Sequence, residues 1–298
     1  MPELSGPLAP GSTIGILGNG QLGRMAALAA ARLGYRCHAY GPEAGAPANQ
    51  VCDAATVAPY DDEAALTRFA EAVDVVTFEF ENIPLATVEV LDRLVPLRPS
   101  TKVLSICQHR LREKEFCNSV SVPTADYRAA EDLASLRQAV EEIGTPCILK
   151  SAEMGYDGKG QVRITAGSDL DEAWNAMRGH AAQAIGIVES IVAFRIEISV
   201  IVARGADGTM RTYVPVENRH KNHILDETIA PANLPVEVTD RAEATARHLA
   251  QEMGLVGLLA VEMFVTHDGK VLVNEMAPRP HNSGHWTLDA CVTSQFEQ

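Results

Sequence analysis

Short apolar runs alternate with amphipathic stretches over the first hundred residues of the chain. An apolar run bounded by glycine, proline or polar residues is typical of a buried strand, and apolar residues at helical spacing are typical of an amphipathic helix. The expected strands are 13–17, 35–40, 51–57 and 73–80, and the expected helices are 21–33 and 62–72. Strands that alternate with helices form βαβ units. We therefore expect a doubly wound α/β domain with a parallel sheet.

Two prolines, Pro96 and Pro99, mark a boundary after which the pattern changes. Residues 100–119 read as polar, charged helical turns. The elements expected beyond them are a helix at 131–142, strands at 147–152 and 161–165, a helix at 168–178, a strand at 184–190, two or three strands within 195–229, a helix at 238–253 and two closing strands. The chain should therefore combine an α/β part with an α+β part. Its 298 residues suggest two or three domains of ~100–200 residues each.

Composition and charge exclude several classes of protein. The chain has 25 Lys and Arg against 39 Asp and Glu, a formal net charge of −14, and it lacks the basic stripe of a nucleic-acid-binding protein. No uncharged apolar run approaches the ~18 residues of a membrane span, and the N-terminal segment carries Glu3 but no basic region. The six cysteines are scattered without a CxxC pair, as buried reduced thiols would be. We expect a cytoplasmic protein that binds neither nucleic acid nor membranes.

The motif GNGQLG at 18–23 fits the pattern GxGxxG between the first expected strand and the first expected helix. Glycines there permit a tight turn, and the amides of the helix start can face an anion. A dinucleotide site would also need an acidic residue at the end of the second strand, but that strand ends at Tyr40, and Glu43 comes only after a Gly-Pro break. We favour an anion or substrate contact through Gln21 and the helix start over a structural turn or a nicotinamide site.

Two glutamates lie in the segment TFEFENIP at 77–84. Side chains alternate along a strand, so Glu79 and Glu81 share a face near the carboxyl end, where parallel sheets hold their ligands. Alternatively, Glu81 and Asn82 cap the helix that starts near Pro84. Glu79 is the stronger candidate for a site.

A glycine-rich loop, EMGYDGKGQ at 153–161, follows an apolar strand that ends in Lys150. Its amides can approach an anion closely, and Lys150 and Lys159 add cationic donors. An ordinary hairpin loop would explain the glycines, but it would not predict a lysine within the preceding apolar strand. The loop therefore indicates phosphate binding.

The segment 258–275 predicts a hairpin with two facing carboxylates. Asp268 and Gly269 between two apolar strands are typical of a two-residue turn. If His267 and Lys270 close that turn, Glu262 stands directly across from Glu275. Facing carboxylates repel each other, so a cation should lie between them.

Oxygen ligands without a nearby His or Cys favour Mg²⁺ or Mn²⁺ over zinc. Glu262 and Glu275 are thus the candidate metal ligands. Asn274 would point to the opposite face of the strand unless a bulge intervenes. The alternative, two exposed glutamates on a solvated face, fits poorly with the apolar residues on either side of both.

The segment APRPHNSGHW at 277–286 holds an arginine, two histidines and an asparagine in ten residues. Prolines and glycine keep it a loop. Next to a carboxylate pair, a guanidinium with two histidines and an asparagine suits a small anion. The four residues are Arg279, His281, Asn282 and His285. His220 in ENRHKNHIL is less decisive, since it fits a surface position equally well.

These features together resemble the ATP-grasp superfamily, whose members activate carboxylates as acyl phosphates. The motifs GNGQLGRM at 18–25, TFEFENI at 77–83, GYDGKGQ at 155–161 and NEMAPRPHNSGHWT at 274–287 are similar to those of the purine-biosynthesis ligases that carboxylate aminoimidazole ribonucleotide. The resemblance runs from about residue 13 to the end, and PRPHNSGHWT is its most specific part.

The resemblance implies a domain division. It places a Rossmann-like pre-ATP-grasp domain at 1–99 and an ATP-grasp domain at 100–298. The latter would consist of a lid at about 122–192 and a central subdomain built from 100–121 and 193–298. Members of this family continue for tens of residues in a small C-terminal domain, so we expect this chain to lack that domain.

The resemblance also implies roles for particular residues. Those expected to bind ATP are Arg110, Lys150, Gly155, Tyr156, Asp157, Gly158, Lys159, Gly160, Gln161, Glu189, Ser190, Ile191, Val192, Glu197, His220, Asn274 and Glu275. Those expected to face bicarbonate and aminoimidazole ribonucleotide are Gln21, Leu22, Glu79, Tyr156, Lys159, Arg279, His281 and Asn282. The catalytic set would be Asp157, Lys159, Arg279, His281 and Asn282, with Asp157 handling a proton.

The implied reaction is the ATP-dependent capture of bicarbonate as carboxyphosphate, followed by carboxylation of the ribonucleotide amine, by a homodimer that uses Mg²⁺ or Mn²⁺. Two alternatives stay open. The chain could be a sister ligase, such as a formate-dependent glycinamide ribonucleotide transformylase or a biotin carboxylase. It could also be a nucleotide-binding protein without turnover.

Overall fold

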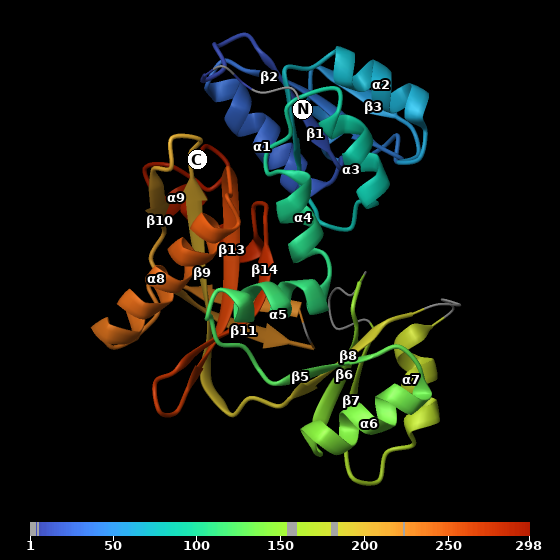
Figure 1. Ribbon diagram of the computed structural model, residues 1–298. Helices are drawn as coiled ribbons and strands as arrows, with labels where there is room; N and C mark the ends of the chain where they lie inside the picture. The colour runs from blue at the N-terminus through green and yellow to red at the C-terminus, as the bar shows by residue number, and fades with distance from the viewer. Residues whose placement is uncertain (1–3, 5, 154–159, 180–183, 223) are drawn as a thin grey trace.

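The computed structural model describes residues 4, 6–153, 160–179, 184–222 and 224–298. The chain forms three sheets arranged along one long axis, with an α/β domain at one end and a small antiparallel sheet at the other (Figure 1). Long strands and the two helices α4 and α5 lie between them. In the part of the chain described, no helix is long and apolar enough to cross a membrane.

The N-terminal domain is a parallel four-stranded sheet in the order β3-β2-β1-β4. The strands are β1 (Thr13–Leu17), β2 (Arg36–Gly41), β3 (Ala54–Val57) and β4 (Val75–Phe78), and the helices are α1 (Gln21–Arg32), η1 (Ala48–Gln50), α2 (Glu63–Glu71) and α3 (Leu85–Asp92). Tyr40, Phe69 and Phe78 lie in its core, with at most 1% of each exposed. The doubly wound fold expected from the alternation of strands and helices is confirmed.

Helices α4 (Thr101–Cys107) and α5 (Arg110–Ser119) connect this domain to the rest. The sequence predicted polar turns here, yet α5 packs against the last strand of the central sheet. It buries Glu113, Lys114 and Cys117 on one face. The buried charges become important in the site described below.

The small sheet is antiparallel, in the order β5-β8-β6-β7, and carries two helices. Its elements are β5 (Tyr127–Ala130), α6 (Leu133–Ile143), β6 (Cys147–Ser151), β7 (Gln161–Ile164), α7 (Leu170–Arg178) and β8 (Gly186–Ser190). Asp132 and Ser135 form a capping box that fixes the start of α6. The sequence pattern missed β5, a four-residue strand with two exposed residues and hence no clear apolar run.

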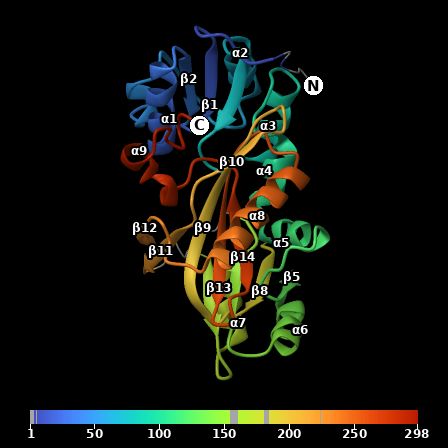
Figure 2. The ribbon, with the colours of Figure 1, turned by 90° about the vertical axis from the view of Figure 1, so that its left-hand side faces the viewer.

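The central sheet is also antiparallel, in the order β12-β11-β9-β13-β14, with β10 paired to β9. Its elements are β9 (Phe194–Arg204), β10 (Met210–Thr212), β11 (Val216–Lys221), β12 (Ile224–Ile229), α8 (Val236–Glu252), β13 (Gly257–Thr266) and β14 (Val271–Ala277), followed by η2 (Asn282–Gly284) and α9 (Thr287–Ala290). Four strands therefore occupy the region where two or three were expected. Helix α8 covers one face of β9 and β13 (Figure 2), and Val261 and Met263 of β13 point into that core. Because side chains alternate along a strand, Glu262 points to the opposite face.

The hairpin β13–β14 corrects one expectation and confirms another. The turn has three residues, because Thr266 and not His267 pairs with Lys270, and Gly269 adopts a φ of 79°. This alone would shift the register by one residue. A bulge between Glu262 and Met263 restores it by inserting Asn274 as an extra residue, so Glu262 does pair with Glu275.

Candidate functional site

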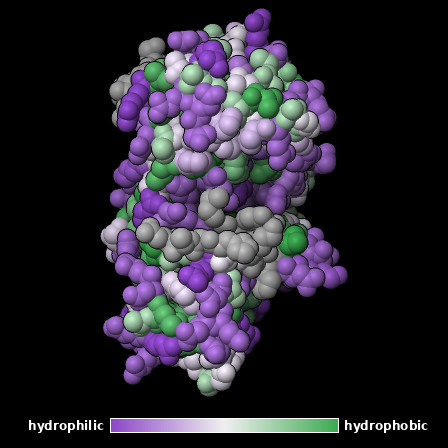
Figure 3. Space-filling model, turned by 90° about the vertical axis from the view of Figure 1, so that its right-hand side faces the viewer, coloured by the Kyte–Doolittle hydropathy of each residue, from purple (hydrophilic) through white to green (hydrophobic). Residues whose placement is uncertain are grey.

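A cleft of about 740 Å³ lies where the three sheets meet. Its volume is within the ~300–1,000 Å³ usual for small-molecule sites. Of the residues singled out from the sequence, those that line it are Glu81, Arg110, Lys150, Gln161, Glu197, His220, Glu262, Asn274, Glu275, Arg279, His281 and Asn282. On the face drawn in Figure 3, hydrophilic residues are the commonest above and below the middle of the molecule, with scattered hydrophobic residues among them.

The facing carboxylates of Glu262 and Glu275 lie on the cleft side of the central sheet. Burial raises the pKa of Glu262 to about 8, and the charge of Glu275 adds to the rise. Enclosure also raises the pKa of Glu275, but the guanidinium of Arg110, at 3.0 Å, outweighs it and lowers the pKa to about 2. The two facing carboxyl groups therefore differ in their affinity for a proton, and Glu275 is the more readily ionised of the two.

This donor set fits a hard divalent cation, which would allow both carboxylates to ionise. The bulge at Asn274 brings its side chain to the same cleft as Glu275, so the amide adds a third oxygen. Among the described residues, no cluster of three or more His, Cys, Asp and Glu is arranged to hold a metal ion. The two glutamates and Asn274 are therefore the candidate site.

Lys150 and Glu189 form a close ion pair at the border of the small sheet. The Lys150 Nζ lies 2.6 Å from Glu189 Oε2, and the buried Lys114 Nζ lies 3.5 Å from Glu189 Oε1. Burial raises the pKa of Glu189, but the two ammonium groups outweigh it and bring the pKa down to about 2. Sequence reasoning missed Lys114, because nothing in the polar segment 100–119 indicated which charges face inward.

Two further groups project from β9 and β11 into the cleft. His220 Nδ1 lies 2.8 Å from Glu197 Oε2, and this hydrogen bond raises the pKa of His220. A bulge between Arg219 and His220 aids this orientation. His220 therefore belongs to the cleft rather than to an outer surface.

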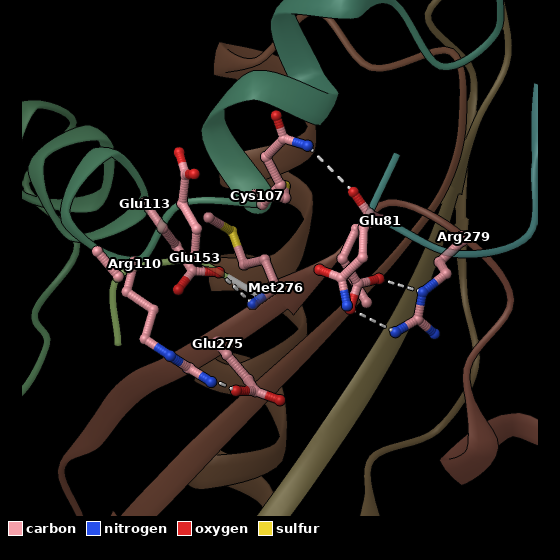
Figure 4. Close-up of a pocket in the computed structure, with 12 residues that line it drawn as sticks. Glu81, Cys107, Arg110, Glu113, Glu153, Glu275, Met276 and Arg279 are labelled. Carbon is pink, nitrogen blue, oxygen red and sulfur yellow. Dashed lines mark hydrogen bonds and ion pairs between the residues drawn. The ribbon is translucent and has the colours of Figure 1, made fainter. Parts of the chain in front are cut away.

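The loop after β14 contributes Arg279, His281 and Asn282. Arg279 donates Nε and Nη2 to the two carboxylate oxygens of Glu81, the latter at 2.8 Å (Figure 4). His281 Nε2 lies 3.5 Å from Glu262 Oε1, and burial followed by the charge of Arg279 lowers the pKa of His281 to about 3. A neutral imidazole thus stands beside the carboxylate pair. His285 turns away, and its Nδ1 contacts the Asn282 carbonyl at 2.8 Å.

The carboxylate of Glu79, which follows β4, lies at the N-terminus of helix α1. Its carboxylate accepts hydrogen bonds from the amides of Gly20 and Gly23, so the anion that the GNGQLG motif faces is a side chain of the same domain. Gln21 is exposed beyond it. Leu22 and Glu79 instead border a separate cavity of about 160 Å³ that reaches Arg279.

Five residues expected in the glycine-rich loop lie outside the described residues: Gly155, Tyr156, Asp157, Gly158 and Lys159. Gly160, with a φ of 71°, closes the loop by accepting a hydrogen bond from the Ser151 amide at 2.8 Å. Gln161 begins β7 and lines the cleft. Ser190, Ile191 and Val192, which were expected to bind ATP, lie at the end of β8 and in the connection to β9, and they are not among the described residues that line the cleft.

Sequence reasoning also missed the apolar wall of the cleft. Phe194 and Phe264 stack with their ring centroids 4.8 Å apart. Ile148, Ile224 and Leu225 line the same cleft. The signal available was a set of large apolar residues at strand positions that face away from the α8 core. The cleft therefore combines an apolar wall with a charged end, as a nucleotide requires.

A smaller cavity of about 50 Å³ lies behind Arg110 and Glu275 (Figure 4). Glu113 reaches this cavity from α5, and its Oε1 accepts a hydrogen bond from the Met276 amide at 2.5 Å. Burial raises the pKa of Glu113 to about 8. A side chain of helix α5 thereby holds the backbone of β14 in place.

Comparison with known families accounts for both halves of the chain. Residues 115–296 match the ATP-grasp domain family, and residues 12–108 match the ribonucleotide synthetase preATP-grasp domain family. The bifunctional purine synthesis protein purC/E of Dictyostelium discoideum is 49% identical over 98% of this chain and 30% of that protein. The N5-carboxyaminoimidazole ribonucleotide synthase of Brucella melitensis is 45% identical over 98% of this chain and 80% of that protein.

Solved structures share the fold. The ADP complex of an N5-carboxyaminoimidazole ribonucleotide synthetase superposes with a TM-score of 0.94 at 45% identity, over 99% of this chain and 77% of that one. The Aspergillus clavatus N5-carboxyaminoimidazole synthase in complex with ADP and aminoimidazole ribonucleotide superposes with a TM-score of 0.88 at 29% identity, over 97% of this chain and 75% of that one. The chain thus spans less than a third of the bifunctional relative and three quarters or more of the others.

Proposed function

Since this chain belongs to the family of N5-carboxyaminoimidazole ribonucleotide synthases, ATP-dependent ligases of purine biosynthesis, we propose that it carboxylates aminoimidazole ribonucleotide with bicarbonate and ATP. We further propose that the cleft where the three sheets meet is its active site. The observation that carries the proposal is the meeting, in one cleft, of a carboxylate pair, the cations Lys150 and Arg110, and an apolar wall.

ATP would lie with its base against the apolar wall and its phosphates toward the charged end. Phe264 and Ile148 offer the flat and aliphatic surfaces that a purine contacts. Lys150 and Arg110 are cations that line the same cleft, and the phosphate charge would lie beside them. Glu197 and His220, which contact each other in the same cleft, suit the ribose hydroxyls.

Glu262, Glu275 and Asn274 would hold Mg²⁺ by their oxygens. When bound, this ion would neutralise charge on the phosphates. Arg110, which now contacts Glu275, would then share its guanidinium with the phosphate oxygens. The chain itself thus supplies both the oxygen ligands for the ion and a guanidinium for the phosphate groups of the nucleotide.

In the first step, a bicarbonate oxygen attacks the γ-phosphorus and the bond to the β-phosphate oxygen breaks, which gives carboxyphosphate and ADP. Such transfers depend chiefly on positioning and charge neutralisation. Arg279, whose Nε and Nη2 already donate to Glu81, has one further N–H on each Nη nitrogen to offer to the bicarbonate, and Asn282 offers an amide beside it. Neutral His281 can donate a hydrogen bond without adding charge next to Glu262.

In the second step, the amine of aminoimidazole ribonucleotide forms a C–N bond with the activated carbon and phosphate leaves. The amine must lose one proton, and Asp157 is the proposed acceptor. Tyr156, Lys159 and the loop glycines Gly155 and Gly158 would enclose carboxyphosphate against water. These roles rest on the resemblance of the motif GYDGKGQ.

Gln21, Leu22 and Glu79 are proposed to border the ribonucleotide site, since Leu22 and Glu79 line a cavity that continues to Arg279. We keep the domain division at residue 99, the lid at about 122–192, a homodimer and a cytoplasmic location as proposals. Light scattering would test the dimer.

The decisive measurement is ADP release from ATP, Mg²⁺ and bicarbonate, with and without aminoimidazole ribonucleotide. Stimulation by the ribonucleotide supports the proposal. ADP release stimulated by formate with glycinamide ribonucleotide, or by biotin, would replace it with a sister ligase. Nucleotide binding without any stimulated release would replace it with a binding protein.

A further inference from the structure

Helix α5 buries the side chain of a lysine almost completely. Lys114 is only 1% exposed, and lysines are almost never so fully buried unless they are paired. Burying an ammonium group is costly unless its hydrogen-bond partners replace water. The contacts of this ammonium therefore indicate why it is there.

The Lys114 Nζ bridges two different sheets. It donates to the Asn274 carbonyl at 2.9 Å on β14 and lies 3.5 Å from Glu189 Oε1 on β8. Asn274 is the extra residue of the bulge and has no partner in register on β13. Lys114 thus stabilises the irregular backbone that turns Asn274 and Glu275 toward the cleft, and it ties that backbone to the small sheet.

The other oxygen of Glu189 accepts the ammonium of Lys150 at 2.6 Å. Lys150 is the residue proposed above to contact the ATP phosphates, so ATP and Glu189 compete for the same cation. If Lys150 were the sole partner of Glu189, its transfer to a phosphate would leave a buried carboxylate unpaired, which is strongly unfavourable. With Lys114 on the other oxygen, Glu189 stays paired.

We propose that Lys114 is a positioning residue. Its ammonium group stays paired with Oε1 of Glu189, so that Lys150 can leave Oε2 and contact the phosphates of ATP. This inference rests on the proposed function, since it requires an ATP site at Lys150. It concerns no contact between Lys114 and the nucleotide. Lys114 lies beneath the cleft and is absent from its lining residues, as far as the described chain shows.

A double-mutant cycle on ADP affinity tests the proposal. Lys114→Met keeps an unbranched side chain, shorter by one atom, and removes its charge, and Glu189→Gln removes the carboxylate that Lys114 contacts. We expect Lys114→Met alone to weaken ADP binding by about tenfold or more. Glu189 would then have Lys150 as its remaining lysine partner, and moving Lys150 to a phosphate would leave this buried carboxylate without an ammonium group. In the Glu189→Gln background the same change should weaken binding by less than about threefold, because no buried charge then competes for Lys150.

An equal effect of Lys114→Met in both backgrounds, or no effect in either, overturns the proposal. If Lys114→Met alone does not fold, the comparison of Glu189→Gln with the double variant still decides, since a large difference there contradicts the proposed role. Lys102→Met, an exposed lysine on α4, is the matched control and should bind ADP like the parent. Failure of the parent chain itself to bind ADP would overturn the proposed function instead.

Discussion

The carboxylate of Glu81 and the guanidinium of Arg279 form a two-pronged ion pair between residues 198 positions apart in the chain. Glu81 follows β4 of the N-terminal domain, and Arg279 follows β14 of the central sheet. The third contact of the guanidinium is with the Pro280 carbonyl at 3.0 Å. The guanidinium that we propose to bind bicarbonate through its remaining N–H groups is therefore held in a fixed orientation by the other domain.

Arg279→Lys should separate the charge of this residue from its fork. Lysine keeps the positive charge but cannot engage both oxygens of Glu81 in parallel or present a planar pair of donors. We expect kcat/KM for bicarbonate to fall by about tenfold or more, and this is measured by ADP release at varied bicarbonate. Arg93→Lys on the exposed end of α3 is the control, and an unchanged kcat/KM in Arg279→Lys would remove Arg279 from the anion site.

The carboxylate pair should tolerate neither neutral replacement. Glu275→Gln and Glu262→Gln each remove one anionic oxygen ligand from the candidate metal site, so we expect ADP release to fall by about a hundredfold or more. Without nucleotide and Mg²⁺, Glu262→Gln should not lower the melting temperature, because the pKa of this carboxyl group is raised by burial. Glu275→Gln should lower it, because this variant also removes the ion pair with Arg110. Glu252→Gln on the exposed end of α8 is the control. Parental turnover in Glu275→Gln would refute the metal assignment.

The hairpin shows how a correct site can follow from an imperfect local prediction. Asp268 and Gly269 indicated a tight turn, and the turn is there, but it is one residue longer than expected. The bulge at Asn274 compensates, and Glu262 still faces Glu275. Apolar periodicity gives no sign of a bulge, because the extra residue is accommodated by contacts from another element, here the ammonium of Lys114.

The remaining gaps have similar causes. The parallel sheet and most helices could be predicted, because their apolar residues follow the period of each element. The burial of Glu113 and Lys114 could not, because a charged residue reads as exposed unless its partners, far away in sequence, are known. The same holds for Glu79, whose hydrogen bonds to Gly20 and Gly23 depend on how β4 lies beside α1.

Gly269→Ala should destabilise the hairpin through its backbone conformation alone. Gly269 has a φ of 79°, and an added Cβ would meet only Val238 at 3.9 Å, so space is available. The left-handed conformation costs a non-glycine residue about 1–2 kcal/mol. We expect this loss in the free energy of unfolding measured with urea, and a smaller loss for Gly269→Asn. Gly45→Ala, with nothing within 4 Å and no left-handed φ, is the control; equal losses at both sites would contradict the argument.

Glu189 should make the protein sensitive to acid. Its pKa is lowered from 4.5 to about 2 by Lys150 and Lys114, which outweigh burial. Its stabilising contribution is complete above pH 4.5, and it is lost as the pH falls toward 2, because the unfolded chain then binds a proton that the folded chain does not. Between pH 5 and about 3, Glu189→Gln should therefore lose less unfolding free energy than the parent. Parallel pH profiles of the two chains would exclude this role.

Glu79→Gln distinguishes a structural role of Glu79 from a role in substrate binding. The two carboxylate oxygens accept the amides of Gly20 and Gly23 at the start of α1. Glutamine keeps one acceptor but turns an NH₂ group toward the second amide, and it removes the negative charge from the positive end of the helix. We expect a loss of about 1–3 kcal/mol in the free energy of unfolding.

If Glu79 only caps the helix, the KM for aminoimidazole ribonucleotide stays at the parental value in the folded variant. If it also borders the ribonucleotide, as proposed, that KM rises by about tenfold or more. Glu43→Gln, an exposed residue in the loop after β2, should change neither quantity.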